Sequence, residues 1–131
     1  MKVLLDTHVL LWALTDSPKM LPRHREIIVD PRNTVSASAI NIAEIAIKSS
    51  IGKMKLSSIY EQHNYAGLLQ AIKDTGLELL PFEPSHAARL GSLPFHHRDP
   101  FDRMLIVQAL HEGYIVLTVD SKFTAYPITL G

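Results

Sequence analysis

The chain has 131 residues, with 13 basic and 13 acidic side chains, so its net charge is zero when histidine is neutral. An apolar share of 47% and a charged share of 20% are typical of globular proteins and exclude the intrinsically disordered class. The absence of cysteine excludes disulfide frameworks and thiolate metal sites, and the zero net charge argues against a general nucleic-acid coat protein. An enzyme whose acidic site is surrounded by basic side chains is still compatible with this balance.

The length corresponds to one domain, and we expect residues 1–131 to fold as a single unit. The apolar N-terminal segment resembles a signal peptide, but Asp6 and His8 interrupt it and no cleavage site of small residues follows. No stretch approaches the roughly 20 apolar residues that span a bilayer. We therefore expect a cytoplasmic protein without a membrane segment.

Short apolar runs alternate with helical patterns along the whole chain. In chain order we predict a strand at 2–5, helices at 7–14 and 22–29, a strand at 34–36, a helix from 38 to the stop at Gly52, a helix within 56–75, a strand at 77–82, a short helix at 84–90, a loop at 94–98, a helix from 99 to 112, a strand at 114–119 and an edge strand at 128–130. Strands that alternate with helices through short connections predict an α/β sandwich with a mainly parallel sheet.

Two carboxylates directly follow predicted strands. Asp6 comes after KVLL, and Asp120 comes after IVLTV. Ligands of open α/β sheets bind outside the carboxyl ends of the strands, so both side chains are expected at that edge. Aspartate is also a preferred N-cap residue, and a capping role explains either residue equally well when it is taken alone.

Glu44 lies in the segment AINIAEIAIKSS, a predicted helix that is apolar almost all round. A buried carboxylate without a partner is costly, so it either stays neutral or finds a cation. Lys48, one helical turn later, offers an ordinary ion pair. Because the helix is so apolar, we favour a role for Glu44 in a metal or catalytic site over that pair.

The segment HHRDPFDRMLIVQAL contains two further acids. Asp99, followed by Pro100, has the pattern of an N-cap, and Asp102 falls in the first helical turn. The positive end of the helix favours the ionised form of Asp102, which is the form that binds a metal. We therefore take Asp102 as the site residue and keep Asp99 as a supporting residue or an alternative ligand.

The chemistry of these acids indicates the type of metal. Carboxylate oxygens without cysteine or a histidine-rich motif suit Mg²⁺ or Mn²⁺ rather than zinc. His86, His96 and His97 do not have the spacing of metal ligands, and we expect them on the surface or in loops.

Four segments carry a family resemblance: LLDTHVLLWAL, SAINIAEIAIKSSIGKMKL, HHRDPFDRMLIVQAL and IVLTVDSKF. In order and spacing they resemble the PIN-domain ribonucleases, specifically the VapC-like toxins of bacterial toxin–antitoxin modules, over nearly the whole chain. The resemblance implies a three-layer α/β/α sandwich and Mg²⁺- or Mn²⁺-dependent endonucleolytic cleavage of RNA. It also implies a homodimer and neutralisation by a cognate antitoxin protein.

Carried over residue by residue, the family's catalytic and metal-binding acids match Asp6, Glu44, Asp102 and Asp120. Thr118 matches the hydroxyl of the family's T-x-D motif that supports the site, and we assign Thr7 and Asp99 to similar support. The family often has another acid just after this motif, where the present chain has Ser121 and Lys122. A fifth ligand is therefore not expected.

The predicted mechanism is in-line attack by a metal-activated water, with Glu44 as the candidate to orient it, leaving 5′-phosphate and 3′-hydroxyl ends. Lys48, Arg98 and Arg103 lie beside the proposed acids in sequence and are candidate contacts to RNA phosphates. A solvated or ion-paired role fits each of these cations equally well.

Three other functions were weighed against the ribonuclease. A phosphatase with an aspartyl nucleophile would have a second Asp two residues after Asp6, where this chain has His8. The acidic pair and late lysine of a phosphoacceptor receiver domain are not evident. A catalytically silent PIN fold that only binds RNA or a partner is the main alternative, although four acids in one crevice would repel phosphate unless a cation lay among them.

Overall fold

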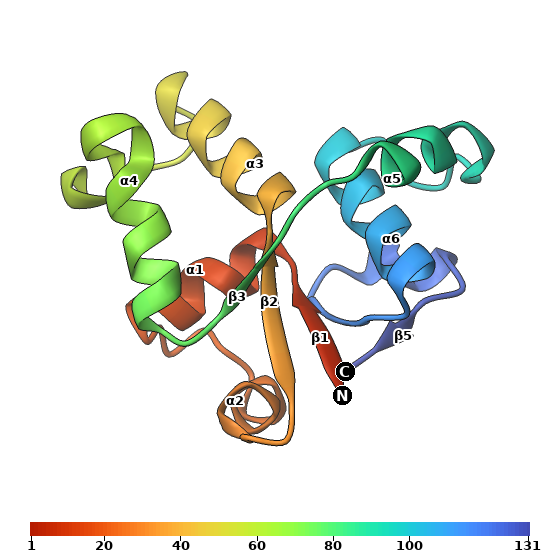
Figure 1. The fold of residues 1–131 in the computed structure, drawn as a ribbon, viewed down its shortest axis with the longest axis horizontal. Helices are drawn as coiled ribbons and strands as arrows, with labels where there is room; N and C mark the ends of the chain where they lie inside the picture. Colours follow the sequence, from red (N-terminus) through yellow and green to blue (C-terminus); the bar gives the residue numbers. More distant parts are fainter.

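The computed structural model describes residues 1–131, which form a five-stranded sheet with helices on both sides (Figure 1). The strand order is β3-β2-β1-β4-β5, and every pairing is parallel. The strands are β1 (Lys2–Leu5), β2 (Thr34–Ser38), β3 (Glu78–Leu80), β4 (Ile115–Leu117) and β5 (Thr129–Leu130). The predicted α/β/α fold with a parallel sheet is confirmed. Its helices are all too short or too polar to cross a membrane.

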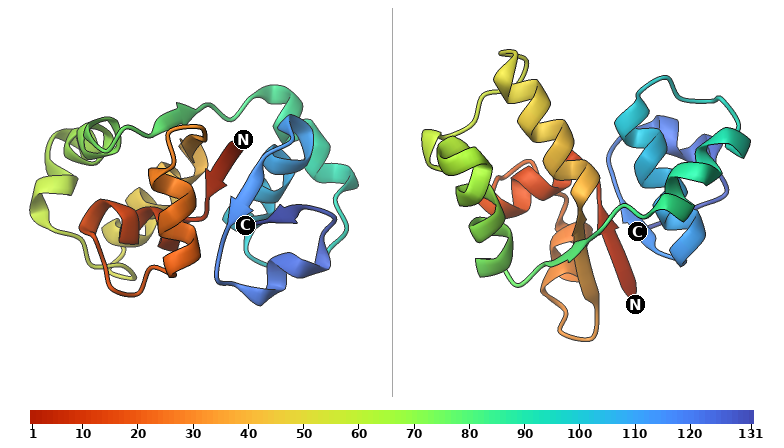
Figure 2. Two further views of the ribbon diagram at one scale, coloured as in Figure 1. Left: turned by 90° about the horizontal axis from the view of Figure 1, so that it is seen from below. Right: turned by 45° about the horizontal axis from the view of Figure 1, so that its top comes forward.

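Six α-helices and two short 3₁₀ segments connect the strands. They are α1 (Thr7–Thr15), α2 (Pro22–Val29), α3 (Ala39–Ser50), α4 (Ser58–Asp74), α5 (Pro84–Arg89), η1 (Leu90–Ser92), α6 (Pro100–Glu112) and η2 (Ser121–Ala125). Figures 1 and 2 show α1, α2 and α4 on one side of the sheet and α5 and α6 on the other.

Successive side chains of β1 are buried on opposite faces of the sheet, which is why helices cover both faces. Val3 and Leu5 belong to one buried cluster, whereas Leu4 between them belongs to a second. Successive side chains of a strand point to opposite faces, so a central parallel strand with helices on both sides is apolar throughout. The first cluster includes side chains of α1 and α4, and the second includes side chains of α6 and η2.

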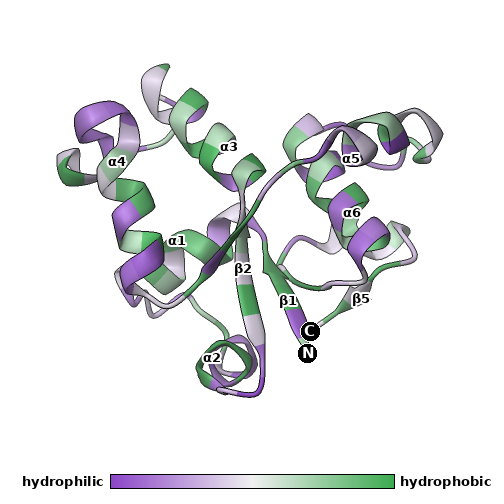
Figure 3. Cartoon of the chain, in the orientation of Figure 1, coloured by the Kyte–Doolittle hydropathy of each residue, from purple (hydrophilic) through white to green (hydrophobic).

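Helix α3 begins at the carboxyl edge of the sheet and contacts both groups of helices. Figure 3 colours most of it as hydrophobic, and its Ile40 and Ile45 are buried in different clusters. Its first turn is fixed by a capping box, in which Ser38 Oγ accepts from the Ile40 amide and Asn41 Oδ1 accepts from the Ser38 amide. This arrangement brings Glu44 between the two sides of the molecule.

Several element ends differ from the sequence predictions. β3 ends at Leu80 because Pro81, which has no amide hydrogen to donate, follows it. β4 stops at Leu117, and the 3₁₀ segment η2 after it was not predicted. Helix α4 leaves helical geometry at residues 62–65, three of which have positive φ, before it continues to Asp74.

Gln108 of α6 links the ends of two strands across the interior. Its side chain is fully buried; Oε1 accepts from Ser38 Oγ at 2.5 Å, and Nε2 donates to the carbonyl oxygen of Pro81 at 3.1 Å. The side-chain amide of Gln108 therefore hydrogen-bonds to the last residue of β2 and to the residue that follows β3.

Replacing Gln108 by Leu is expected to lower the free energy of unfolding by about 1–3 kcal/mol, because the buried Ser38 hydroxyl loses its acceptor and the Pro81 carbonyl loses its donor. Urea unfolding followed by circular dichroism measures this change. The exposed Gln70 of α4 provides the matched control, since Gln70→Leu should change the free energy by less than about 0.5 kcal/mol. Equal effects of the two substitutions would contradict the role of Gln108.

Candidate metal centre

The carboxyl ends of β1 and β4 are neighbours at the point where the strand order changes direction. Such a switch point in a parallel sheet leaves a crevice beyond the strand ends. A cavity of about 660 Å³ lies there, which we call the acidic cavity, and none of its lining residues is hydrophobic. The lining consists of Asp6, Thr7, His8, Glu44, Lys48, His96, His97, Arg98, Asp99, Asp102, Asp120 and Lys122. The structure thus brings together all four acids predicted from sequence.

Asp6 caps a helix and lines the cavity at the same time. Its Oδ1 accepts from the Val9 amide at 2.8 Å, and its Oδ2 accepts from the Thr118 hydroxyl at 2.5 Å. Burial raises the pKa of Asp6, although these two hydrogen bonds oppose the rise. The capping and site interpretations of Asp6 are therefore compatible.

Glu44 is only 3% exposed and forms two close contacts. Its Oε1 accepts from the Thr7 hydroxyl at 2.5 Å, and its Oε2 pairs with Lys48 Nζ at 2.5 Å. The side-chain Nδ2 of Asn41 in turn donates to the Thr7 hydroxyl at 3.0 Å. The ion pair that the sequence allowed is present, so Glu44 combines this pair with its place in the cavity wall.

Lys48 is the cation nearest to the acids. Besides Glu44, it has Asp99 Oδ2 at 3.8 Å. Partial burial acts to lower the pKa of Lys48, but the hydrogen bond and charge of Glu44 outweigh it, so the net change is a rise. Lys48 therefore stays charged and offsets part of the negative charge in the cavity.

The two acids at the start of α6 have different roles. Asp99 is the N-cap, because its Oδ1 accepts from the amides of Phe101 at 2.8 Å and Asp102 at 3.3 Å. Burial and the negative charges of the other acids in the cavity raise the pKa of Asp102 to about 7. Asp102 thus carries a proton more readily than an ordinary aspartate, first because it is buried and then because other acids lie near it.

Asp120 follows β4 and is held on both oxygens. Its Oδ1 accepts from the Lys122 amide at 2.9 Å, and its Oδ2 lies 3.2 Å from His97 Nε2. Partial burial opposes ionisation, but these two contacts prevail and lower the pKa of Asp120. Thr118 accepts from the Asp120 amide at 3.0 Å and donates to Asp6, so one hydroxyl joins the ends of β4 and β1.

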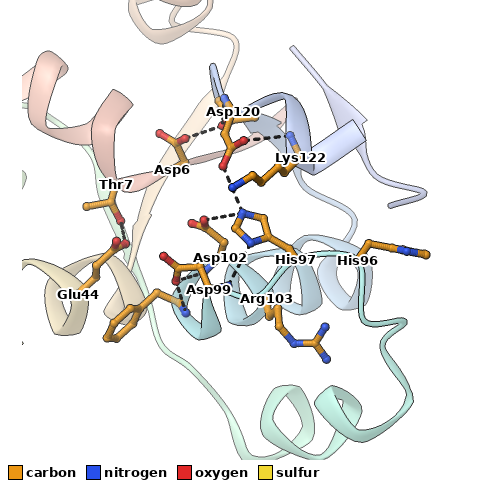
Figure 4. Close-up of polar contacts among 12 residues, drawn as sticks. Asp6, Thr7, Glu44, His96, His97, Asp99, Asp102, Arg103, Asp120 and Lys122 are labelled. Atoms are coloured by element: carbon orange, nitrogen blue, oxygen red, sulfur yellow. Dashed lines mark hydrogen bonds and ion pairs between the residues drawn. The ribbon is translucent and has the colours of Figure 1, made fainter. Parts of the chain in front are cut away.

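The expectation for the histidines was wrong at His86, which is fully buried in α5. His96 is exposed and His97 lies in a loop, as expected, but His97 is only 5% exposed. Figure 4 shows the His97 ring between Asp102 and Asp120, and its Nε2 lies 3.0 Å from Asp102 Oδ2. Spacing along the chain could not reveal this contact because the partners belong to different elements.

The three predicted RNA-binding cations have different locations. Lys48 and Arg98 line the acidic cavity, whereas Arg103 does not. The Arg103 guanidinium donates to the carbonyl oxygens of Pro94 and Leu93 and lies 4.5 Å from the centre of the Phe95 ring, and Figure 4 shows it pointing away from the acids. Lys122, which was not among the predicted RNA-binding residues, is a further cation in the cavity wall.

The donor set of the acidic cavity fits a divalent cation. Five carboxyl groups from α3, α6 and the ends of β1 and β4 share the cavity, while Lys48 pairs closely with Glu44. Burial and the charges of the other acids both raise the pKa of Asp102, which indicates that the negative charge is only partly balanced. Oxygen ligands of this kind suit Mg²⁺ or Mn²⁺.

Comparisons with known proteins agree with this architecture. The family model of the PIN domain matches residues 3–128. The fold is similar to chains in three solved structures: VapBC2 from Rickettsia felis bound to a promoter DNA fragment (20% identity, TM-score 0.71, covering 100% of this chain and 98% of that chain), DNA-bound VapBC from Salmonella typhimurium (16%, 0.67, 99% and 96%), and VapBC-5 from Mycobacterium tuberculosis, of the VapBC family of toxin–antitoxin systems (19%, 0.56, 95% and 89%). A search of curated proteins found no match.

Replacing Asp102 by Asn is expected to stabilise the metal-free protein at neutral and higher pH. The pKa of Asp102 is raised from 3.8 to about 7, so its contribution to stability is greatest below pH 3.8 and is lost as the pH rises through about 7. The advantage of the Asn variant should therefore grow over this range, to on the order of 1 kcal/mol after allowance for solvent screening. Urea unfolding in EDTA at pH 4, 6 and 8 measures it.

Asp74→Asn, at an exposed position of α4, is the control and should show no such growth with pH. Saturating Mg²⁺ is expected to stabilise the wild type more than Asp102→Asn. An ion that binds only the folded state stabilises that state, and the Asn variant lacks one of the carboxylates expected to bind it. A larger advantage of the Asn variant at pH 4 than at pH 8 would overturn this electrostatic account.

Proposed function

The chain belongs to the PIN-domain family, and from this premise we propose that it is a metal-dependent endoribonuclease that hydrolyses RNA phosphodiester bonds. The observation that carries the proposal is the convergence of Asp6, Glu44, Asp102 and Asp120 on the acidic cavity. A surface that only bound RNA would repel phosphate with so many acids, unless a cation lay among them. The acids and a divalent cation together make phosphate binding and hydrolysis chemically reasonable.

We assign Asp6, Asp102 and Asp120 to holding Mg²⁺ or Mn²⁺, with help from Glu44 and with Asp99 as the alternative ligand. When bound, such an ion lowers the pKa of an attacking water and stabilises the charge that develops on the phosphate. The supporting hydroxyls of Thr118 and Thr7 fix the carboxylates that they contact.

Glu44 is proposed to orient the attacking water for in-line displacement of the 3′-oxygen. Its carboxylate is fixed on one side by Thr7 and on the other by Lys48, so its direction into the acidic cavity is set before substrate binds. Displacement of the 3′-oxygen by this water leaves a 5′-phosphate and a 3′-hydroxyl.

The cations in the wall of the acidic cavity are proposed to contact the RNA backbone. Lys48 and Arg98 occupy this wall, and Lys122 adds a third positive charge beside Asp120. Arg103 is assigned a structural role instead, since its guanidinium holds the loop that precedes α6.

We further propose that the protein is the toxin of a toxin–antitoxin pair, that it forms a homodimer, and that a cognate antitoxin neutralises it in the cytoplasm. The likeness of its fold to chains of VapBC complexes, one of them described as a toxin–antitoxin system, supports this role. The nuclease and the toxin roles are separable and are tested separately.

Purified protein is expected to cleave RNA in the presence of Mg²⁺, and cleavage is expected to stop when EDTA is added. Asp6→Asn should lower the rate by more than about 100-fold, because loss of groups that merely support metal ligands already costs about 10- to 100-fold. Gel analysis of labelled RNA and chemical mapping of its ends measure the rate and the products.

Asp74→Asn serves as the control for a lost carboxylate outside the cavity and should cleave like the wild type. Ends that carry a 2′,3′-cyclic phosphate would rule out the water mechanism in favour of attack by the RNA's own 2′-hydroxyl. RNA binding that persists without any cleavage would favour the silent binding module instead.

Controlled expression in bacteria is expected to arrest growth, because hydrolysis of cellular RNA blocks protein synthesis. Growth curves after induction, followed by sequencing of RNA ends, measure the arrest and identify the cleaved RNA. Asp6→Asn should accumulate to the same level and permit growth. Arrest by both proteins would show that toxicity does not depend on the acidic cavity, and it would contradict the toxin proposal.

A further inference from the structure

His97 has one ring nitrogen whose role is fixed by the backbone. Its Nδ1 accepts a hydrogen bond from the Asp99 amide at 3.1 Å. A backbone amide can only donate, so Nδ1 carries no proton, and the neutral ring has its proton on Nε2.

The Nε2–H of His97 faces two carboxylates that reach the acidic cavity from different elements. It hydrogen-bonds to Asp120 Oδ2 at 3.2 Å, and the distance from Nε2 to Asp102 Oδ2 is 3.0 Å. Both contacts involve the Oδ2 atoms, and no protein group hydrogen-bonds to Asp102 Oδ1. One N–H thus lies between the acid after β4 and the acid in the first turn of α6.

The ring is held firmly in this place by the core. The backbone amide of His97 donates to the hydroxyl of Tyr126 at 3.0 Å, and Tyr126 is 4% exposed. The ring lies edge-on to Phe123, with 6.0 Å between ring centres and 89° between planes, and Phe123 is fully buried. The Asp99 amide and the Phe123 ring thus fix the His97 side chain while Tyr126 fixes its backbone, so the ring is suited to fix the position of flexible neighbours.

The arrangement superficially resembles a metal site, because the ligand atoms of His97, Asp102 and Asp120 lie within 4.8 Å of one another. A histidine binds a metal through a nitrogen lone pair, and here Nε2 uses that position for its proton. Ligation by Nε2 would require His97 to give up the hydrogen bond from Asp99, which helps to shape the start of α6.

We propose that His97 is a positioning residue of the acidic cavity: a neutral imidazole whose Nε2–H holds Asp102 and Asp120 at the spacing that a divalent cation requires, without binding the cation itself. The inference rests on the proposed function for the purpose of that spacing. It adds a residue outside the four acids, and one that acts through two of them.

Two substitutions separate the two nitrogens of the ring. His97→Asn retains an oxygen near the place of Nδ1 to accept from the Asp99 amide but has no donor that reaches the place of Nε2. His97→Gln places an amide N–H near Nε2. Comparison of the two variants therefore isolates the donor to the carboxylates.

Calorimetric titration with Mn²⁺ is expected to show binding weakened by about 10- to 100-fold in His97→Asn but by less than about threefold in His97→Gln, as for other groups that orient metal ligands. The exposed His63, outside the cavity, gives the control His63→Asn, which should bind like the wild type. Equal loss in the Asn and Gln variants would overturn the positioning role.

The wild-type protein supplies a measurement that does not depend on how the variants fold. Two-dimensional ¹H–¹⁵N spectra of the histidine rings, recorded without metal and with saturating Mg²⁺, should show His97 with its proton on Nε2 in both states. A proton on Nδ1 in either state would overturn the inference. Failure to cleave RNA, with this tautomer and the Mn²⁺ results intact, would instead contradict only the proposed function.

Discussion

Repulsion among carboxylates brought to one end of a parallel sheet is the constraint on which the rest of this structure depends. The fold places the ends of β1 and β4 side by side and directs α3 and α6 toward the same point, so their acids cannot avoid one another. Together with burial, this repulsion raises the pKa of Asp102 to about 7. Much of the surrounding polar structure offsets this repulsion: the Thr118 and Thr7 hydroxyls, the ammonium group of Lys48 and the ring of His97 all contact a carboxylate.

Helix capping and site building are accomplished here by the same side chains. In Asp6, Asp99 and Asp120, one carboxylate oxygen accepts a hydrogen bond from a backbone amide at the start of a helical segment. The second oxygen is then directed by a rigid backbone rather than by a freely rotating side chain, which is the kind of preorganisation that a metal or catalytic site needs. Capping and the proposed function are therefore complementary, although the sequence alone presents them as alternatives.

Features that depend on local chain chemistry were predictable from sequence, whereas those that depend on packing were not. Asp6 and Asp120 follow apolar strands, and Asp99-Pro100 is a recognisable helix start, so their positions followed from neighbouring residues. The contact of His97 with Asp102 and Asp120 depends on how η2 and Tyr126 pack beneath the loop, which no spacing along the chain reveals. Arg103 is adjacent to Asp102 in sequence, but the helix turns its side chain toward the preceding loop.

The pairing of β1 with β4 has a consequence for biosynthesis. β1 occupies the centre of the sheet, yet one of its two neighbours, β4, follows it in the chain only after β2 and β3. Until β4 is synthesised, Asp6 lacks both the Leu117 carbonyl oxygen that accepts from its amide and the Thr118 hydroxyl that donates to its carboxylate. A nascent chain therefore holds an incomplete acidic cavity until β4 and the Asp120 that follows it have been synthesised.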